Sequence, residues 1–189
     1  MKQPNRSDAL PLFIATTQDG VEEVRLGRGS RTMVSRQHAK NSHPLAHRWR
    51  VKAQKELRSY LSGRSRSFST PCDLRGLPAF THAVLEAATQ IPYGEVRSYR
   101  WLAQHLGKPR AARAVGNALA RNPIPIIIPC HRVVRSNGTL GGYALGTALK
   151  KRLLEMEKKH SRLRGKARGW QRKLIFTKRV DLPLLRRPG

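Results

Sequence analysis

The feature that most constrains this fold is the apolar run Ile126–Ile128, which leads through Pro129 directly into Cys130 and His131. The run is too short to span a membrane, so it predicts a strand or another segment buried in a core. Proline has no backbone N–H to donate, so regular pairing ends at Pro129. We therefore expect Cys130 to lie where the buried chain meets a cleft.

The Cys130–His131 pair indicates nucleophilic chemistry, because a thiol reacts as the thiolate and a neighbouring imidazole lowers its pKa. Adjacent side chains on a strand point to opposite faces, so the two groups need a turn, or a water between them, to act together. From the pair alone a second interpretation stays open, in which Cys130 is a buried structural cysteine beside a core histidine.

The first part of the chain predicts two strands and a helix. Residues 10–17 and 21–26 have the composition of two strands joined by a tight turn. Residues 27–48 lack periodicity and predict a loop, whereas apolar positions recur at helical spacing from about Ala46 to Leu61. Residues 63–78 are polar and contain Gly and Pro, which predicts a linker. We expect no catalytic residue in this part.

The second part predicts mostly helices. The first spans residues 80–88 and ends before a sharp turn at residues 91–94. Ser98 is a suitable N-cap for a short helix that ends at Gly107, and another helix follows at about residues 110–121. A helix, a short glycine-containing turn and a second helix form the pattern of a helix-turn-helix.

The second helix of this pair is nearly bare, because small residues occupy most of its positions. They are Ala111, Ala112, Ala114, Gly116, Ala118 and Ala120. Such a surface suits close approach to a sugar-phosphate backbone, and it equally suits tight packing against another helix. Arg113 lies on this helix and, by sequence alone, is either a DNA contact or an ordinary solvated residue.

The charge of the chain restricts its partners. It has 38 Lys+Arg against 11 Asp+Glu, a formal net charge of +27 and a pI near 11.7. Such a field attracts polyanions and speeds encounter with them. Acidic lipid surfaces remain an alternative on charge alone. No segment reaches membrane-spanning length, and we expect no membrane partner.

Cysteine usage indicates a reducing, intracellular compartment, because Cys72 and Cys130 are too few for a disulfide framework. We expect Cys72 to be a passive thiol. No Cys or His set has the spacing of a tetrahedral metal site, and no glycine-rich loop typical of a methyl donor follows a strand. We therefore expect neither a metal nor a cofactor. The apolar residues 9–15 favour a first strand over a signal peptide.

Several short motifs occur in a fixed order along the second part of the chain. They are Ile91-Pro92-Tyr93-Gly94, Ser98-Tyr99, Ala111-Ala112-Arg113-Ala114-Val115-Gly116, Asn122-Pro123, Pro129-Cys130-His131-Arg132-Val133-Val134, Gly141-Gly142-Tyr143, and Leu153-Leu154 with Glu157. In this combination the chain closely resembles the methylated-DNA–protein-cysteine methyltransferases, the O6-alkylguanine-DNA alkyltransferases, over about residues 75–157. A weaker match covers Leu57 to Phe68.

The resemblance implies an α/β fold class with three parts. A small N-terminal α/β domain would occupy residues 1–74. A mainly helical C-terminal domain with a DNA-binding helix-turn-helix would occupy residues 75–159, and a basic tail residues 160–189. The tail either adds phosphate contacts or is dispensable, and residues 174–176 are a candidate short strand in it.

The resemblance also implies the reaction, in which an alkyl group on O6 of guanine, and on O4 of thymine, in DNA passes irreversibly to Cys130. Each molecule would react once. His131 would take the thiol proton through a water, and Glu157 would orient the imidazole, as in a catalytic triad. Asn122 would connect the helix-turn-helix to the active-site turn, although an Asn-Pro turn without a catalytic role is the alternative.

A base-binding pocket is implied as well. The Tyr99 hydroxyl near N3 and the backbone N–H of Ala144 near O6 would stabilise the leaving guanine. The carbonyls of Cys130 and Val133 would accept hydrogen bonds from its exocyclic amine. Tyr143, which follows two glycines, would close the pocket as a lid, although an ordinary β-turn has the same composition.

In this family the second helix of the helix-turn-helix enters the minor groove, where Ala112 and Ala114 would allow a close approach. The alkylated base must leave the duplex to reach a buried thiol. Arg113 would fill the space that the extruded nucleotide leaves, and Tyr99 would help to rotate its phosphate.

The expected partner is therefore double-stranded DNA that contains O6-alkylguanine, bound by a monomer in the cytoplasm in association with the nucleoid, or in a eukaryotic nucleus. Two other function classes remain. One is a damage-sensing binder without chemistry, and the other is a helix-turn-helix regulator in which Cys130 is structural.

Overall fold

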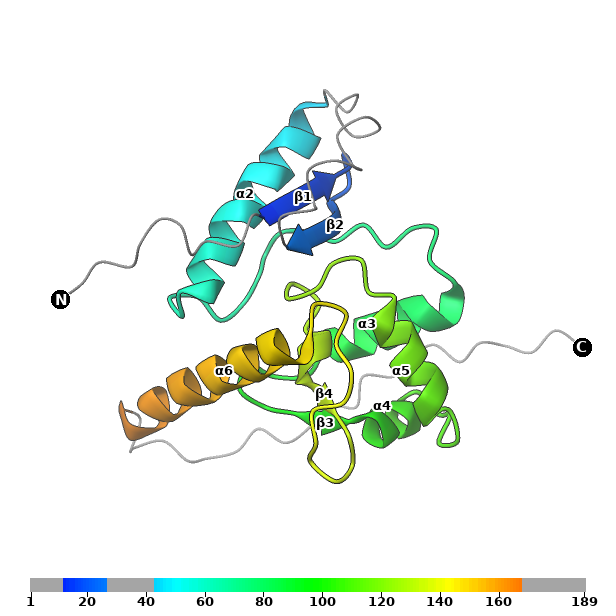
Figure 1. The fold of residues 1–189 in the computed structure, drawn as a ribbon. Helices are drawn as coiled ribbons and strands as arrows, with labels where there is room; N and C mark the ends of the chain where they lie inside the picture. The colour runs from blue at the N-terminus through cyan, green and yellow to red at the C-terminus, as the bar shows by residue number, and fades with distance from the viewer. Residues whose placement is uncertain (1–11, 27–42, 168–189) are drawn as a thin grey trace, which may run out of the picture.

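The computed structural model of the chain describes residues 12–26 and 43–167. The N-terminal part contains a two-stranded sheet with one helix along it, and the C-terminal part contains four helices around the segment of Cys130 (Figure 1). This arrangement confirms the predicted α/β fold class. The candidate strand at residues 174–176 lies outside the described residues, as does most of the predicted loop 27–48.

The N-terminal sheet forms as predicted from two strand-like segments on either side of a tight turn. Strands β1 (Leu12–Thr16) and β2 (Val21–Leu26) are antiparallel, with Leu12 opposite Leu26. Helix α2 (Pro44–Leu61) packs on them through a buried stripe at helical spacing. Its buried residues are Ala46, Ala53, Leu57 and Tyr60. Three consecutive residues of β1, at positions 14–16, are buried, so both faces of the sheet are covered there.

Helix α2 begins at Pro44, which corrects the predicted start at Ala46 and the predicted loop to residue 48. The His43 imidazole Nδ1 accepts a hydrogen bond from the backbone N–H of Leu45 at 3.3 Å, and Pro44 occupies the first turn. Proline is favoured there because the N–H it lacks would have no helical partner. Histidine is an uncommon N-cap, which is why the sequence pattern placed the start too late.

The predicted linker 63–78 is held against the sheet. The backbone of Val21 donates to the Pro71 carbonyl and accepts from the Asp73 N–H, at 2.8 and 2.7 Å. On the helix side, the Glu56 carboxylate accepts hydrogen bonds from the backbone and hydroxyl groups of Ser69 and Thr70. These hydrogen bonds hold the linker in place against both β2 and α2.

The C-terminal part consists of helices and one short parallel strand pair. In chain order the elements are α3 (Ala79–Thr89), β3 (Arg97–Ser98), α4 (Tyr99–His105), α5 (Ala112–Ala120), a 3-10 helix (Cys130–Arg132), β4 (Val133–Val134) and α6 (Thr147–Ala167). Strands β3 and β4 are parallel, with Arg97 opposite Val133. The pairing connects the start of the helix-turn-helix to the residues that follow Cys130.

The predicted helix-turn-helix is confirmed in its main features. The Ser98 hydroxyl caps α4 by accepting from the Trp101 N–H at 3.0 Å, and Gly107 ends the helix with φ of +68°. Helices α3, α4 and α5 pack against one another. Helix α5 begins at Ala112 rather than at the predicted residue 110, because Ala111 closes a turn onto the Lys108 carbonyl at 2.8 Å.

Helix α6 is longer than the predicted helix at residues 149–159 and continues to Ala167. The predicted boundary between domain and tail at residue 160 therefore falls inside a helix. Near that point the Arg66 guanidinium donates to the His160 carbonyl at 2.7 Å, so the linker covers this part of α6. None of the described helices combines the length and the apolarity that a membrane span requires.

One hydrophobic core joins the two parts. Buried residues of the sheet and α2 belong to the same cluster as those of α3, α5 and the segment before Cys130. The Val24 N–H also donates to the Pro123 carbonyl at 2.8 Å, just before the isoleucine run. The N-terminal part thus supports the segment that presents Cys130.

Candidate active site

The isoleucine run is buried, as predicted, but it forms a turn rather than a strand. Ile126 has φ of +75°, in a region that β-branched residues rarely adopt. Such a conformation costs about 1–3 kcal/mol and persists only where surrounding contacts fix it. After Pro129 the chain turns through the 3-10 helix, which places Cys130 at the edge of a cavity and His131 behind it.

The Asn122 side chain fixes this turn with every hydrogen-bonding group it has. Its Oδ1 accepts from the Ile124 N–H at 2.9 Å, and its Nδ2 donates to the Ile128 carbonyl at 3.2 Å. The same Nδ2 lies 3.1 Å from Cys130 Sγ. An N–H directed at sulfur stabilises the thiolate, so Asn122 both shapes the turn and favours the ionised form of Cys130.

Two polar groups oppose the effect of burial on Cys130. The residue is 6% exposed, and burial raises the pKa of its thiol. The hydrogen bond from Asn122 and the positive charge of Lys150 act in the opposite direction. The Lys150 ammonium is buried and donates to the Val133 carbonyl at 2.6 Å and to the Gly142 carbonyl at 3.2 Å. Burial lowers its pKa to about 8.

His131 and Glu157 form a buried base–carboxylate pair. The distance from His131 Nε2 to Glu157 Oε1 is 2.7 Å, and both side chains are fully buried. Burial lowers the pKa of His131, and the hydrogen bond and charge of Glu157 oppose this. The other ring nitrogen, Nδ1, is buried and has no hydrogen-bond partner among the described residues. If Nε2 carries the proton, Nδ1 is free to accept one.

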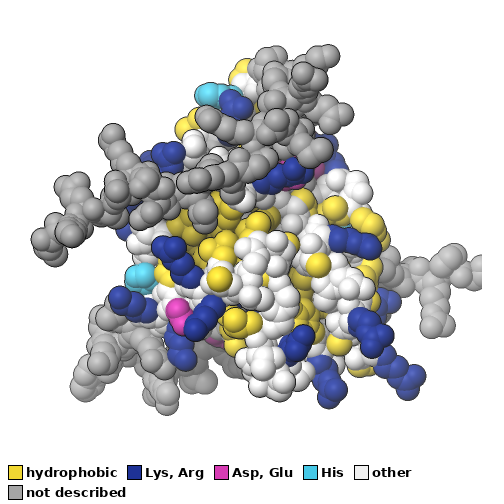
Figure 2. Space-filling view, viewed as in Figure 1, with side chains coloured by type: hydrophobic (Ala, Val, Ile, Leu, Met, Phe, Trp, Pro, Cys, Tyr) yellow, Lys and Arg dark blue, Asp and Glu magenta, His cyan; other side chains and the backbone are white. Residues whose placement is uncertain are grey.

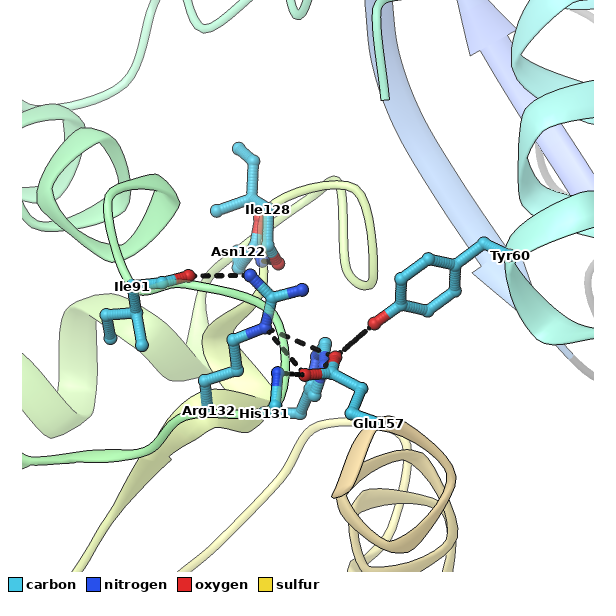
Figure 3. Close-up of polar contacts among 8 residues, drawn as sticks. Tyr60, Ile91, Asn122, Ile128, His131, Arg132 and Glu157 are labelled. Atoms are coloured by element: carbon cyan, nitrogen blue, oxygen red, sulfur yellow. Dashed lines mark hydrogen bonds and ion pairs between the residues drawn. The ribbon is translucent and has the colours of Figure 1, made fainter. Parts of the chain in front are cut away.

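Glu157 accepts hydrogen bonds from three further donors (Figure 3). Arg132 Nε lies 3.2 and 3.1 Å from its two oxygens, and the Gly94 N–H donates to Oε2 at 2.7 Å. The third donor is the hydroxyl of Tyr60 on α2. Burial alone would raise the pKa of this carboxyl, but the hydrogen bonds and the Arg132 charge lower it to about 2. Glu157 is thus ionised at any working pH.

A cavity of about 790 Å³ opens above Cys130. Its walls are the inner side of α5, the start of α4 and the segment 141–144. Of the predicted pocket residues, Tyr99, Tyr143 and Ala144 line it, whereas Val133 is buried beneath and is not among the lining residues. Asn117 and Arg135, which the sequence reasoning did not single out, line it too.

Gly141 shows why small residues border this cavity. Its φ is +67°, and a Cβ atom built on it would lie 2.8 Å from the Tyr99 hydroxyl oxygen. That distance is too short for a real contact, so any side chain here would displace Tyr99. The glycine allows the segment 141–144 to close directly onto the tyrosine hydroxyl.

Helix α5 borders both the cavity and the solvent. Arg113 is exposed and lines the cavity rim with Ala112, while Ala114 is exposed outside the rim. The surrounding segment is strongly basic, since no Asp or Glu occurs between Glu95 and Glu155. The cations exposed on the helix-turn-helix are Arg100, Lys108, Arg110, Arg113 and Arg121. A polyanion that contacts α5 would therefore lie directly over the entrance to Cys130.

Comparisons with known proteins agree with this geometry. The family model for the DNA-binding domain of 6-O-methylguanine DNA methyltransferase matches residues 79–159. A methylated-DNA–protein-cysteine methyltransferase of Methanosarcina acetivorans is 37% identical over 147 residues, which cover 78% of this chain and 91% of the relative. The chain belongs to the methylated-DNA–protein-cysteine methyltransferase family.

Solved structures of this methyltransferase family have the same fold. The Mycobacterium tuberculosis OGT, crystallised in complex with DNA, has a TM-score of 0.67 and 40% identity, covering 79% of this chain and 88% of that chain. The Methanococcus jannaschii O6-methylguanine DNA methyltransferase has a TM-score of 0.56 and 26% identity, covering 94% of this chain and 98% of that chain.

Tyr60 on α2 belongs to the part of the chain in which no catalytic residue is expected, yet its hydroxyl donates to Glu157. No signal in the sequence assigned a role to Tyr60, Arg132 or Lys150. Tyr60 belongs to the apolar stripe of its helix, so burial in the core was a sufficient reason for a tyrosine at this position. Arg132 and Lys150 are charged side chains that are almost fully buried, which sequence patterns do not predict.

A second cavity, of about 850 Å³, lies beside α3 and contains Cys72 but neither Cys130 nor His131. Burial raises the pKa of Cys72 to about 11, which supports the interpretation of this residue as a passive thiol. Within residues 12–26 and 43–167, no three His, Cys, Asp or Glu side chains form a group that could hold a metal ion.

Proposed function

We propose that this protein repairs DNA by transferring the alkyl group of O6-alkylguanine, and of O4-alkylthymine, to Cys130 in a single irreversible turnover. The observation that carries the proposal is the position of Cys130 between the basic helix α5 and the buried His131–Glu157 pair. A damage sensor needs the cavity but not the base, and a regulator needs neither. Family membership favours the same chemistry.

The thiol is activated through His131. Its Nδ1 takes the Cys130 proton through a water, and Glu157 stabilises the imidazolium that forms. The thiolate then attacks the O-alkyl carbon, so that an S–C bond forms while the C–O6 bond breaks. The electron pair leaves with the guanine. The Asn122 amide and the Lys150 charge stabilise the sulfur before attack.

The cavity wall supplies groups for the leaving base. Tyr99 and the backbone N–H of Ala144 donate to the guanine as negative charge develops on it. The Val133 carbonyl already accepts from Lys150, so its second lone pair is the one that receives the exocyclic amine. Tyr143, whose hydroxyl is buried without a partner among the described residues, closes over the base.

The base reaches the cavity by extrusion from the duplex, because α5 separates the DNA surface from Cys130. Ala112 and Ala114 allow this helix close to the backbone, and Arg113 occupies the gap in the base stack. Lysine and arginine side chains are spread over the visible face, where acidic side chains are few (Figure 2). The described site is complete in one chain, so we propose a monomer that acts wherever the genome lies, in the nucleoid or nucleus.

Intact mass measurement tests the proposal. The protein is incubated with a duplex that contains one O6-methylguanine, and its mass is compared with that of protein treated with the unmodified duplex. We expect a gain of one methylene group, which peptide mapping assigns to Cys130. Binding of the damaged duplex without a mass change would instead identify a sensor, and equal binding of both duplexes would identify a regulator.

The Lys150 charge gives a prediction on reactivity. Lys150→Met keeps most of the stem but removes the charge, so the pKa of Cys130 should rise. Alkylation by iodoacetamide should slow about tenfold at neutral pH, as expected for a shift of about one pKa unit. The control is Lys151→Met, because that neighbour is exposed on α6. Equal rates for both variants would show that Lys150 does not activate the thiol.

The part of the basic tail that follows helix α6 gives a prediction on the salt dependence of DNA binding. Residues 168–189 follow helix α6 and contain seven cations, Arg168, Arg172, Lys173, Lys178, Arg179, Arg186 and Arg187, against one acid, Asp181. Removing them should weaken binding to all duplexes alike and flatten the log–log salt dependence by ~0.9 for each phosphate that the shortened protein leaves unneutralised. An unchanged slope in a fluorescence anisotropy titration would mean that the tail does not touch DNA.

A further inference from the structure

The hydroxyl of Tyr60 connects the N-terminal part to the reaction centre. Tyr60 lies near the end of α2, is fully buried, and donates a hydrogen bond to Glu157 Oε1 across 97 residues of sequence. Its oxygen lies 3.4 Å from His131 Nε2. Figure 3 shows the side chain reaching from α2 to the same carboxylate that the His131 and Arg132 side chains contact.

The orientation of this hydroxyl is fixed by the packing of its ring. The Tyr60 ring lies against Phe68, with centroids 4.9 Å apart, and meets the edge of Tyr93 at 5.8 Å. Tyr93 is itself covered by the guanidinium groups of Arg66 and Arg132, at 5.6 and 5.7 Å. Rotation of the phenol away from Glu157 would require these contacts to break.

We infer that Tyr60 is a positioning residue, which holds Oε1 of Glu157 through its hydroxyl and so limits the negative charge that Glu157 presents to the imidazole. The inference rests on the proposed function, because it assigns the N-terminal part a role in setting the reactivity of Cys130. Tyr60 touches neither the cavity nor the alkyl group, so it acts through the Glu157–His131 pair that its hydroxyl contacts.

The physical reason is the sharing of one carboxylate among several donors. A phenol that donates to Oε1 withdraws electron density that would otherwise stabilise a proton on His131. Burial, followed by the Glu157 charge, raises the pKa of Tyr60, so the phenol remains a donor throughout the working range of pH. The other charged or titratable groups around the pair are Arg132, Lys150, Tyr93, Tyr143 and Arg66, and none of them changes in the test below.

The test uses Tyr60→Phe, which keeps the ring and removes the hydroxyl. Without this donor, Glu157 stabilises the imidazolium more strongly, and the pKa of His131 rises. His131 can accept a proton only when it is neutral. The acidic limb of the plot of rate against pH should therefore move to higher pH by on the order of one unit. The rate is that of a single turnover with free O6-benzylguanine, which needs no base extrusion.

Two controls separate positioning from folding. Ile14→Ala removes a buried side chain of the same core but leaves the hydroxyl and the ring contacts of Tyr60 in place, so it should lower the melting temperature while the pH profile stays in place. Incorporation of 3-fluorotyrosine at position 60 keeps the shape and gives a more acidic donor, so the limb should move to lower pH. This second variant preserves a test if Tyr60→Phe fails to fold.

The outcomes are distinct. Opposite shifts for phenylalanine and fluorotyrosine, with none for Ile14→Ala, support the role of the hydroxyl. A profile for Tyr60→Phe or the fluorotyrosine protein that matches wild type overturns it, as does an equal shift in Ile14→Ala. Failure of the wild-type protein to gain an alkyl group would instead contradict the proposed function itself.

Discussion

Cys130→Ala is expected to abolish alkyl transfer completely while binding to damaged duplex stays close to that of wild type. The substitution removes the sulfur that accepts the alkyl group, and Asn122, His131 and Glu157 have no other nucleophile to activate. We propose that DNA binds at α4 and α5, whose exposed cations the change does not touch. Intact mass after incubation with O6-methylguanine duplex measures the transfer, and fluorescence anisotropy measures the binding.

The matched control for this variant is Cys72→Ala. Cys72 is the second cysteine of the chain, and burial raises its pKa to about 11, so little thiolate exists at neutral pH. Its removal should leave the rate and extent of transfer unchanged. Transfer that persists in Cys130→Ala and disappears in Cys72→Ala would place the acceptor in the cavity beside α3, contrary to the proposed site.

Arg113→Ala is expected to slow repair of duplex DNA about a hundredfold, with little effect on the reaction with free O6-benzylguanine. Extrusion of a base costs a few kcal/mol, and a guanidinium in the vacated space offsets part of that cost. Loss of about 2.7 kcal/mol of this stabilisation corresponds to the expected factor. Single-turnover rates with both substrates, at equal protein concentration, provide the comparison.

Arg110→Ala is the matched control, because Arg110 is exposed just before α5 but does not line the cavity. It should weaken binding to damaged and undamaged duplexes alike and leave the rate at saturating DNA unchanged. Equal losses of Arg113→Ala on the duplex and on the free base would place Arg113 in the chemistry or the fold instead of in extrusion.

Local signals in the sequence were sufficient for most of the elements. Ser98 and Gly107 mark the two ends of α4, and the turn at residues 18–20 between two strand-like segments predicts the hairpin, because caps and turns are short-range signals. The ends of α2 and α6 were less accurate. A histidine cap precedes Pro44, and the basic sequence after Lys159 contains no glycine or proline before Gly165, so α6 continues where a tail was expected.

The sequence by itself identified the family and the candidate nucleophile and base. Cys130 and His131 are adjacent, and the ordered motifs around them identify the methyltransferase family without coordinates. The tertiary structure alone decided which groups surround Glu157. Tyr60 reaches it across 97 residues, and Gly94 across 63, through packing of α2 and α6 against the turn. Periodicity shows only that such a residue is buried, whereas the partner it meets depends on how the whole core closes.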